Sequence, residues 1–122
     1  MKLVPNAFYI YVSDIERSTA FYESLFEITP VFSSPFYVAY GIDDGITMAL
    51  WAGNSGALEG NPVRTTELGL NINLQPAEID ALYECWLEHG ATTVEAPYDA
   101  VFGRTFLVAD PDGNLIRMAP VD

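Results

Sequence analysis

Apolar and polar positions along the first half of the chain predict one helix and four strands. Residues 7–12 are aromatic and β-branched, as is typical of a buried strand. Residues 15–26 carry apolar side chains at helical spacing, and Ser13 and Glu16 are spaced as a capping box for this helix. Three short strands are predicted to follow at residues 31–33, 36–41 and 46–52. The first half is therefore expected to follow the order β-α-β-β-β.

The second half shows the same series of patterns. Residues 68–74 form a further predicted strand, and Pro76 begins a helix that is expected to run to about His89, where Gly90 ends it. Three more strands are predicted at residues 92–94, 101–108 and 115–119, with a turn at residues 110–113. The order β-α-β-β-β is thus expected twice.

The two halves also resemble each other in sequence. The run Phe21–Glu23 falls opposite Leu82–Glu84, a shift of 61 residues (82 minus 21). A duplicated unit with one helix on a four-stranded sheet must bury the other face of that sheet, and facing its twin buries it. We therefore predict an α+β fold in which two curved sheets enclose a cleft. We predict a single domain over residues 1–122, with modules at about 1–53 and 67–122 and a linker at about 54–66.

Composition and charge limit the partners of such a domain. Half of the residues are hydrophobic, and 17 acidic residues against 5 basic ones give a net charge of −12. This charge repels nucleic acid and anionic membrane surfaces and suits neutral or cationic small molecules. There is no run of about 18 apolar residues and no signal-peptide pattern, so no membrane span is expected. A single cysteine, Cys85, indicates a reducing cytoplasm.

Two motifs and the paired modules resemble a known family. The helix segment Ser18–Tyr22 (STAFY) and the turn Asp110–Asn114 (DPDGN), which follows a glycine-containing strand, are similar to those of the vicinal oxygen chelate superfamily. This superfamily contains glyoxalase I, bleomycin-resistance proteins and extradiol dioxygenases, and the resemblance covers the whole chain. Several segments are most similar to its phenazine-antibiotic resistance members of the griseoluteic acid type: residues 11–19, 30–32, 37–39, 49–51, 101–107 and 110–117. The resemblance implies a homodimer that binds the drug where two chains meet and confers resistance by binding rather than by chemistry.

The resemblance also locates four positions at which enzymes of the superfamily hold a divalent metal through His, Gln or Glu. Aligning the strands places Ala7, Ala49, Gly69 and Arg117 at these positions, and none of them can ligate such an ion. Cys85 and His89 have the i, i+4 spacing of ligands, but we expect both to lie on the helix face that packs on the sheet. We therefore predict no metal, no cofactor and no enzymatic activity.

Strand alternation indicates which side chains line the predicted cleft. If residues 43–44 form a two-residue hairpin loop, Phe36, Tyr40 and Trp51 share one wall; if the loop is one residue longer, Tyr37 replaces Phe36 and Tyr40 leaves. In the second half Phe106 is expected to lie near Arg117. Each arginine could bind a ligand carboxylate or an acidic residue of the chain. The predicted ligand-binding residues are Phe32, Phe36, Tyr40, Trp51, Asn71, Arg104, Phe106 and Arg117.

Three functions follow from this reasoning. The first is an antibiotic-resistance protein that sequesters a planar aromatic drug, a phenazine, without metal or chemistry. The second is a metal-dependent enzyme of the glyoxalase or dioxygenase type with atypical ligands. The third is a non-enzymatic accessory domain whose cleft is filled by its own side chains.

Overall fold

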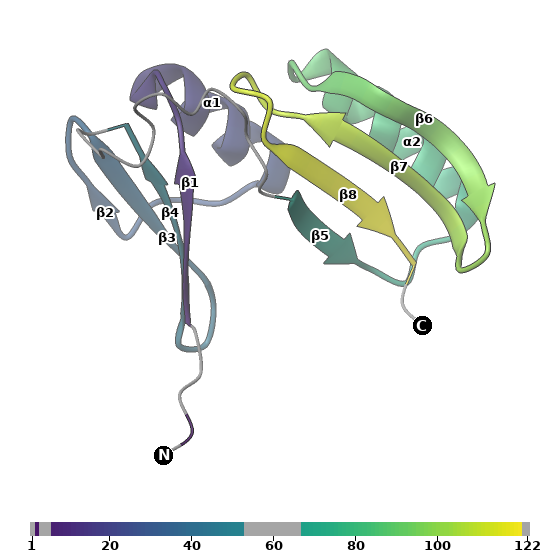
Figure 1. The fold of residues 1–122 in the computed structure, drawn as a ribbon, viewed down its shortest axis with the longest axis horizontal. Coiled ribbons are helices and arrows are strands. Elements are labelled where there is room, and N and C mark those ends of the chain that lie inside the picture. Colours follow the sequence, from purple (N-terminus) through teal and green to yellow (C-terminus); the bar gives the residue numbers. More distant parts are fainter. Residues whose placement is uncertain (1, 3–5, 53–66, 121–122) are drawn as a thin grey trace. The chain divides into compact units, whose positions relative to one another are not determined.

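Two similar units make up the computed structural model, which describes residues 2, 6–52 and 67–120 (Figure 1). The first unit contains β1 (Ala7–Tyr11), α1 (Ile15–Phe26), β2 (Phe32–Ser33), β3 (Tyr37–Asp43) and β4 (Ile46–Trp51). The second contains β5 (Glu67–Asn71), α2 (Pro76–Glu88), β6 (Thr92–Ala100), β7 (Gly103–Ala109) and β8 (Leu115–Ala119). The predicted α+β class and the repeated order β-α-β-β-β are confirmed. The predicted linker lies outside the described residues, and the cleft stays a prediction.

Each unit holds one four-stranded sheet, and the two sheets have the same topology. The strand orders are β1-β4-β3-β2 and β5-β8-β7-β6. In each sheet the first strand pairs in parallel with the last, and the other pairs are antiparallel. The identical order in both units confirms the prediction of two βαβββ modules.

The first helix has the predicted bounds, but its N-cap lies one residue later than predicted. Asp14, rather than Ser13, is the N-cap residue, and its side-chain Oδ1 accepts a hydrogen bond from the backbone N–H of Arg17 at 3.2 Å. Along the helix Tyr22 and Leu25 are buried, and so are Ile10 and Leu50 of the sheet, which alternate with the residues of its other face. These apolar side chains make up the core of the first unit.

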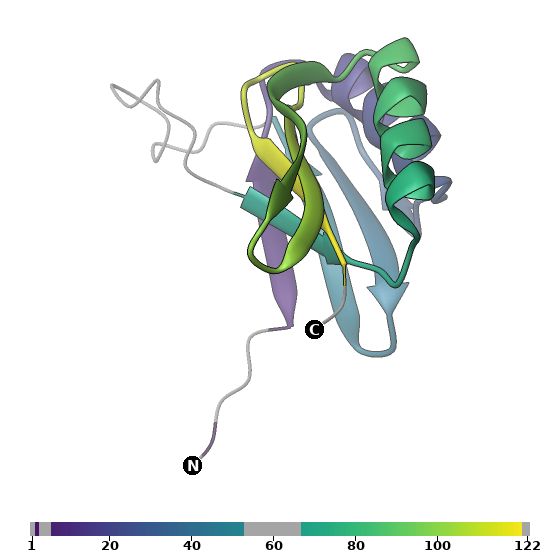
Figure 2. The same cartoon turned by 90° about the vertical axis from the view of Figure 1, so that its right-hand side faces the viewer.

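The second helix lies along one face of its sheet (Figures 1 and 2). Pro76 stands in the first turn, as predicted, and Gln75 and Glu78 form a capping box that the sequence analysis did not identify. Trp86 of α2 packs edge-on against Phe106 of β7, with ring centroids 5.4 Å apart. Phe106 is fully buried, so it belongs to the core under the helix.

The register of the β3–β4 hairpin decides which aromatic side chains share a face. Gly41 pairs with Thr47 and Asp43 with Ile46, so Ile42 is an extra residue at a β-bulge. The loop consists of residues 44–45, and a φ of 72° at Gly45 suits its lack of a side chain. The prediction of a loop at residues 43–44 is therefore wrong, and the alternative register, shifted by one residue, is confirmed.

The β7–β8 hairpin differs from prediction in the same way. Ala109 pairs with Leu115, so the loop spans the five residues 110–114 rather than four. The buried Asp110 holds this loop, because its Oδ1 accepts hydrogen bonds from the backbone N–H groups of Asp112 and Asn114, both at 2.8 Å. As a result Leu107, not Phe106, pairs with Arg117, and the predicted proximity of Phe106 to Arg117 is wrong.

Several strands begin or end at other residues than predicted. Strand β6 continues to Ala100 rather than ending at residue 94, and residues 101–102 form the turn that leads into β7. Strand β5 ends at Asn71 rather than at residue 74. Within the described ranges no helix is both long and apolar enough to cross a membrane.

Candidate functional site

Aromatic side chains gather on the face of the first sheet that α1 does not cover. We call this set the aromatic face; it consists of Tyr9, Tyr11, Phe32, Tyr37 and Trp51. The Trp51 ring lies at its centre, with centroid distances of 6.3 Å to Tyr9, 6.0 Å to Tyr11 and 6.4 Å to Tyr37. Phe32 extends the set through Tyr37, 6.0 Å away. These separations lie in the range of attractive edge-to-face and tilted ring pairs.

Strand pairing explains how the sequence builds this face. Tyr11, Trp51 and Tyr37 stand at the same level on three neighbouring strands, so their side chains project to the same side. The next level holds Ala49 and Ala39 between the larger rings of Tyr9 and Phe32. Ala49 and Ala39 are buried, whereas Tyr9 and Phe32 are about half exposed, so the rings form the accessible surface of this face, and such a surface suits a flat apolar molecule.

A charged network occupies the corresponding face of the second sheet. We call it the arginine face; it consists of Glu67, Gly69, Asn71, Glu95, Thr105 and Arg117. Arg117 of β8 donates from Nε to Glu67 at 3.3 Å and from Nη2 to Glu95 at 3.0 Å. Its Nη1 donates to the hydroxyl of Thr105 at 3.4 Å. The nitrogens of this guanidinium thus hydrogen-bond to residues of the other three strands of the sheet, β5, β6 and β7.

The surroundings keep this guanidinium charged. Burial lowers the pKa of Arg117, but side-chain hydrogen bonds to Glu95, Tyr98 and Glu67 outweigh that effect and raise the pKa above its ordinary value. Two carboxylates against one cation leave this cluster with a net charge of −1. The cluster therefore does not present a free positive charge.

Space is open beside Arg117. Gly69 is its direct partner in the β5–β8 register, and a Cβ atom built on Gly69 would meet no heavy atom within 4 Å. Asn71, two residues further along β5, is exposed on the same side. This opening suits a ligand better than a packed core would.

Of the predicted ligand-binding residues, three lie under the helices instead. Tyr40 is fully buried on the α1 side, where its hydroxyl donates to Glu23 Oε2 at 3.1 Å. Burial, followed by the nearby Glu23 carboxylate, raises the pKa of Tyr40. Phe106 and Arg104 lie on the α2 side, and the placement of all three on the open face is wrong because each hairpin register is shifted by one residue.

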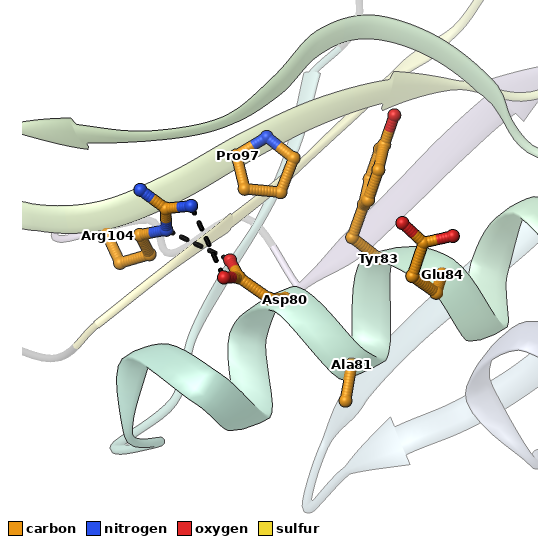
Figure 3. A pocket seen from close by; sticks show the side chains of 6 residues that line it. All are labelled: Asp80, Ala81, Tyr83, Glu84, Pro97 and Arg104. Atoms are coloured by element: carbon orange, nitrogen blue, oxygen red, sulfur yellow. Dashed lines mark hydrogen bonds and ion pairs between the residues drawn. The ribbon is translucent and has the colours of Figure 1, made fainter.

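Arg104 is bound to acidic residues of its own unit. Its Nε and Nη2 donate to the two carboxylate oxygens of Asp80 on α2, at 2.9 and 3.3 Å (Figure 3). Its Nη1 donates to Asp99 at 3.3 Å. The hydrogen bond to Asp80 raises the pKa of Arg104. It lines an open groove of about 370 Å³ between α2 and the β6–β7 hairpin, together with Asp80, Ala81, Tyr83, Glu84 and Pro97. Of the two alternatives, the acidic partner is the one that the structure contains, for Arg104 as for Arg117.

The remaining predicted residues divide between the open faces and a turn. Trp51 and Phe32 belong to the aromatic face, and Arg117 and Asn71 belong to the arginine face. Phe36 lies in the turn before β3 with 62% of its surface exposed, and Tyr37 takes the place opposite Trp51 that was predicted for it.

Comparison with known proteins places the chain in a family. The sequence model of the glyoxalase, bleomycin resistance protein and dioxygenase superfamily matches residues 5–118. The chain belongs to this superfamily. It is 38% identical to the phenazine antibiotic resistance protein EhpR of Enterobacter agglomerans, over 98% of this chain and 94% of that protein.

Solved structures of the superfamily share the fold. Protein ATC0852 of Agrobacterium tumefaciens has a TM-score of 0.86 at 27% identity, covering 99% of both chains. The fosfomycin resistance protein FosX of Mesorhizobium loti has a TM-score of 0.72 at 21% identity, covering 100% of this chain and 94% of that one, and shows the fold alone.

The residues at the four metal positions of the superfamily do not fit a divalent ion. Ala7 and Ala49 lie on the open side of the first sheet and Gly69 on that of the second, and none has a donor side chain. Arg117 brings a positive charge that Glu67 and Glu95 already neutralise. Among residues 6–52 and 67–120 no group of three or more His, Cys, Asp or Glu could hold a metal ion.

Cys85 and His89 do not supply a substitute site. Both are exposed on α2, with Cys85 Sγ 3.8 Å from His89 Nδ1, and the Nδ1 atom lies 2.8 Å from the Cys85 carbonyl oxygen. The expectation that they pack against the sheet is wrong, because Trp86 between them is the residue that turns inward.

The predicted ligand-binding residues did not include Tyr9, Tyr11, Tyr37, Glu67, Glu95 and Thr105 of the two faces. Tyr9 and Tyr11 alternate with the buried Ile10, so the period of the first strand already indicated them. Tyr37 depended on a hairpin register that was left open. Glu67 and Glu95 carry no local signal as partners of Arg117, because 50 and 22 residues separate them from it along the chain.

Proposed function

We propose that this protein is an antibiotic-resistance protein that binds a planar aromatic drug of the phenazine class and sequesters it without chemistry. The observation that carries the proposal is the aromatic face, where four further rings gather around or beside Trp51 on one side of the first sheet. The 38% identity to a phenazine antibiotic resistance protein supports the choice of ligand.

The energy of such binding comes from ring contacts and burial. An offset or edge-to-face pair contributes about 0.5–1.5 kcal/mol beyond the area that it buries. Contacts with Trp51 and one neighbouring tyrosine, together with burial of most of a three-ring ligand, suffice for micromolar affinity, about −8 kcal/mol.

The side chains at the four metal positions support binding without chemistry. With alanine, alanine, glycine and a paired arginine at the four metal positions, this chain lacks the groups through which the enzymes of the superfamily hold their ion. The superfamily does include enzymes, so the proposal requires a direct test of the drug after binding.

The proposed working form is a homodimer in which the drug binds where two chains meet. The proposed place of action is the cytoplasm, the reducing compartment that a chain with a single cysteine fits. Sedimentation of the purified protein with and without ligand tests the assembly.

Tryptophan fluorescence tests which face binds the ligand. The chain has only two tryptophans, and only one of them lies on an open sheet face. Trp51 belongs to the aromatic face, whereas Trp86 is a buried residue of α2 that packs against Phe106 of β7. Griseoluteic acid or phenazine-1-carboxamide should quench the wild-type protein and its Trp86→Phe variant, and Trp51→Phe should lose most of the quenching. Replacing Trp51 with Ala should weaken binding by roughly tenfold, about 1.4 kcal/mol.

Two results would refute the proposal. Absence of quenching and of a shift in Tm at saturating phenazine would remove the ligand class. Recovery of a chemically altered drug, or binding that is lost on chelation and restored by Ni²⁺, Zn²⁺, Fe²⁺ or Mn²⁺, would favour the metal-dependent enzyme instead.

A further inference from the structure

We propose that Arg117 stacks the flat face of its guanidinium on an aromatic ligand and does not form a bidentate ion pair with a ligand carboxylate. This inference rests on the proposed function and narrows it to planar aromatic ligands whose substituents near Arg117 are neutral or positively charged.

The hydrogen bonds of Arg117 leave its plane as the available surface. A guanidinium has five N–H donors, all pointing outward from its edges. Glu67, Glu95 and Thr105 each take one of them, on three different nitrogens, which leaves one N–H on Nη1 and one on Nη2, and Tyr98 is a further hydrogen-bond partner of this side chain. A bidentate pair with a carboxylate needs two parallel N–H groups on one edge, whereas stacking on a ring uses only the flat face. Because every nitrogen already donates, a ligand carboxylate would share these nitrogens with the acceptors of the chain, whereas a ring on the flat face displaces none of these bonds.

Electrostatics favours the same choice. An incoming carboxylate would join Glu67 and Glu95 around one guanidinium, and three anions against one cation repel one another. It would also approach a protein with a net charge of −12. A neutral ring is repelled neither by the two carboxylates nor by the net charge of the protein. A ring with an amino substituent is attracted by the two carboxylates.

Room for a ring exists on this face. The side chain of Arg117 keeps 24% of its surface exposed although it is held on three sides. Its register partner Gly69 leaves open space where other residues would place a Cβ. A cation on the face of an aromatic ring contributes about 0.5–2 kcal/mol.

Arg104 provides a matched control. It has the same exposed fraction, 24%, and likewise two acidic partners, Asp80 and Asp99. However, it lies on the helix side of the sheet, away from the arginine face (Figure 3). A variant of Arg104 therefore changes charge and ion pairing to the same extent without touching the proposed stacking surface.

The test compares three ligands of one size by calorimetry: phenazine, phenazine-1-carboxamide and phenazine-1-carboxylate. In the wild type the carboxamide should bind at least as tightly as the carboxylate. Arg117→Ala should weaken all three about fivefold, and Arg117→Lys, which keeps the charge but not the plane, should not restore them. Glu95→Gln should improve carboxylate binding relative to carboxamide about threefold, because it frees an edge of Arg117 and removes one negative charge. Arg104→Ala should leave all three affinities unchanged.

Other outcomes overturn the inference in distinguishable ways. A selective loss of carboxylate binding in Arg117→Ala, or tighter carboxylate than carboxamide binding in the wild type, would show a carboxylate clamp. Equal affinities in wild type and Arg117→Ala would show that Arg117 does not contact the ligand; in both cases the proposed function stands. If the wild type binds none of the three, the proposed function fails and this inference fails with it.

Discussion

Tyr40 and Trp51 show how one residue of register separates a stabilising side chain from a binding one. Both are aromatic and lie on adjacent strands, but Tyr40 is buried beneath α1 and donates to Glu23, whereas Trp51 contacts the rings of the open face. The chemical type of a residue therefore does not assign its role; the side of the sheet does.

The variant Tyr40→Phe should lower stability and leave ligand binding intact. It removes a buried hydroxyl and its 3.1 Å hydrogen bond to Glu23, which costs about 0.5–1.5 kcal/mol. Urea unfolding at pH 7 measures this difference, and phenazine titration should give the wild-type affinity. A loss of affinity without a loss of stability would show that Tyr40 contacts the ligand, and would contradict its placement beneath α1.

The same variant carries a signature at high pH. Burial and the Glu23 carboxylate raise the pKa of Tyr40, so the folded protein keeps this hydroxyl protonated at a pH where the unfolded tyrosine, with a pKa of about 10, ionises. Unfolding then releases a proton, and stability falls as the pH rises above about 10. The wild type should therefore lose its advantage over Tyr40→Phe between about pH 10 and 11. A constant difference across that range would contradict the assignment.

At the scale of elements, hairpin turns decide what the sequence can predict. The order of helices and strands and the start of α2 follow from periodicity and the repeat. The sequence did not predict which side chains lie on which face of each sheet. The bulge at Ile42 shifts the β3–β4 register by one residue, and the inclusion of Asn114 in the β7–β8 loop shifts the β7–β8 register by one residue. A shift of one residue exchanges the two faces of a strand, which moved Tyr40, Phe106 and Arg104 out of the predicted site.

The β7–β8 turn should contribute strongly to the stability of the second unit. Asp110 accepts hydrogen bonds from two backbone N–H groups and from the Asn114 side-chain amide at 2.9 Å, and both residues are buried. The variant Asp110→Ala leaves buried donors without acceptors and should cost about 2–4 kcal/mol, measured by chemical unfolding. The exposed Asp43, whose Oδ1 accepts only from the adjacent N–H of Asp44 at 2.7 Å among the described contacts, is the control. Its change to alanine should cost less than about 0.5 kcal/mol, and equal costs at the two turns would contradict this account.

At the scale of the whole molecule, the net charge and the arrangement of the arginine face both disfavour anionic ligands. The net charge of −12 repels anions before they reach any site, and on the arginine face the carboxylates of Glu67 and Glu95 outnumber the guanidinium of Arg117. Selection against anionic ligands is therefore expected in the rate of association as well as in the affinity.

Salt separates these two effects. Raising NaCl from about 10 to 100 mM shortens the screening length from about 30 to 10 Å, so long-range repulsion weakens. The association rate of phenazine-1-carboxylate, followed by stopped-flow fluorescence, should then rise about two- to fivefold, while the rate for the carboxamide stays constant. A carboxylate clamp would give the opposite sign, because salt weakens a favourable ion pair. A falling rate or affinity for the carboxylate would thus show that a free cation, and not the edge-bound Arg117 of this structure, governs the encounter.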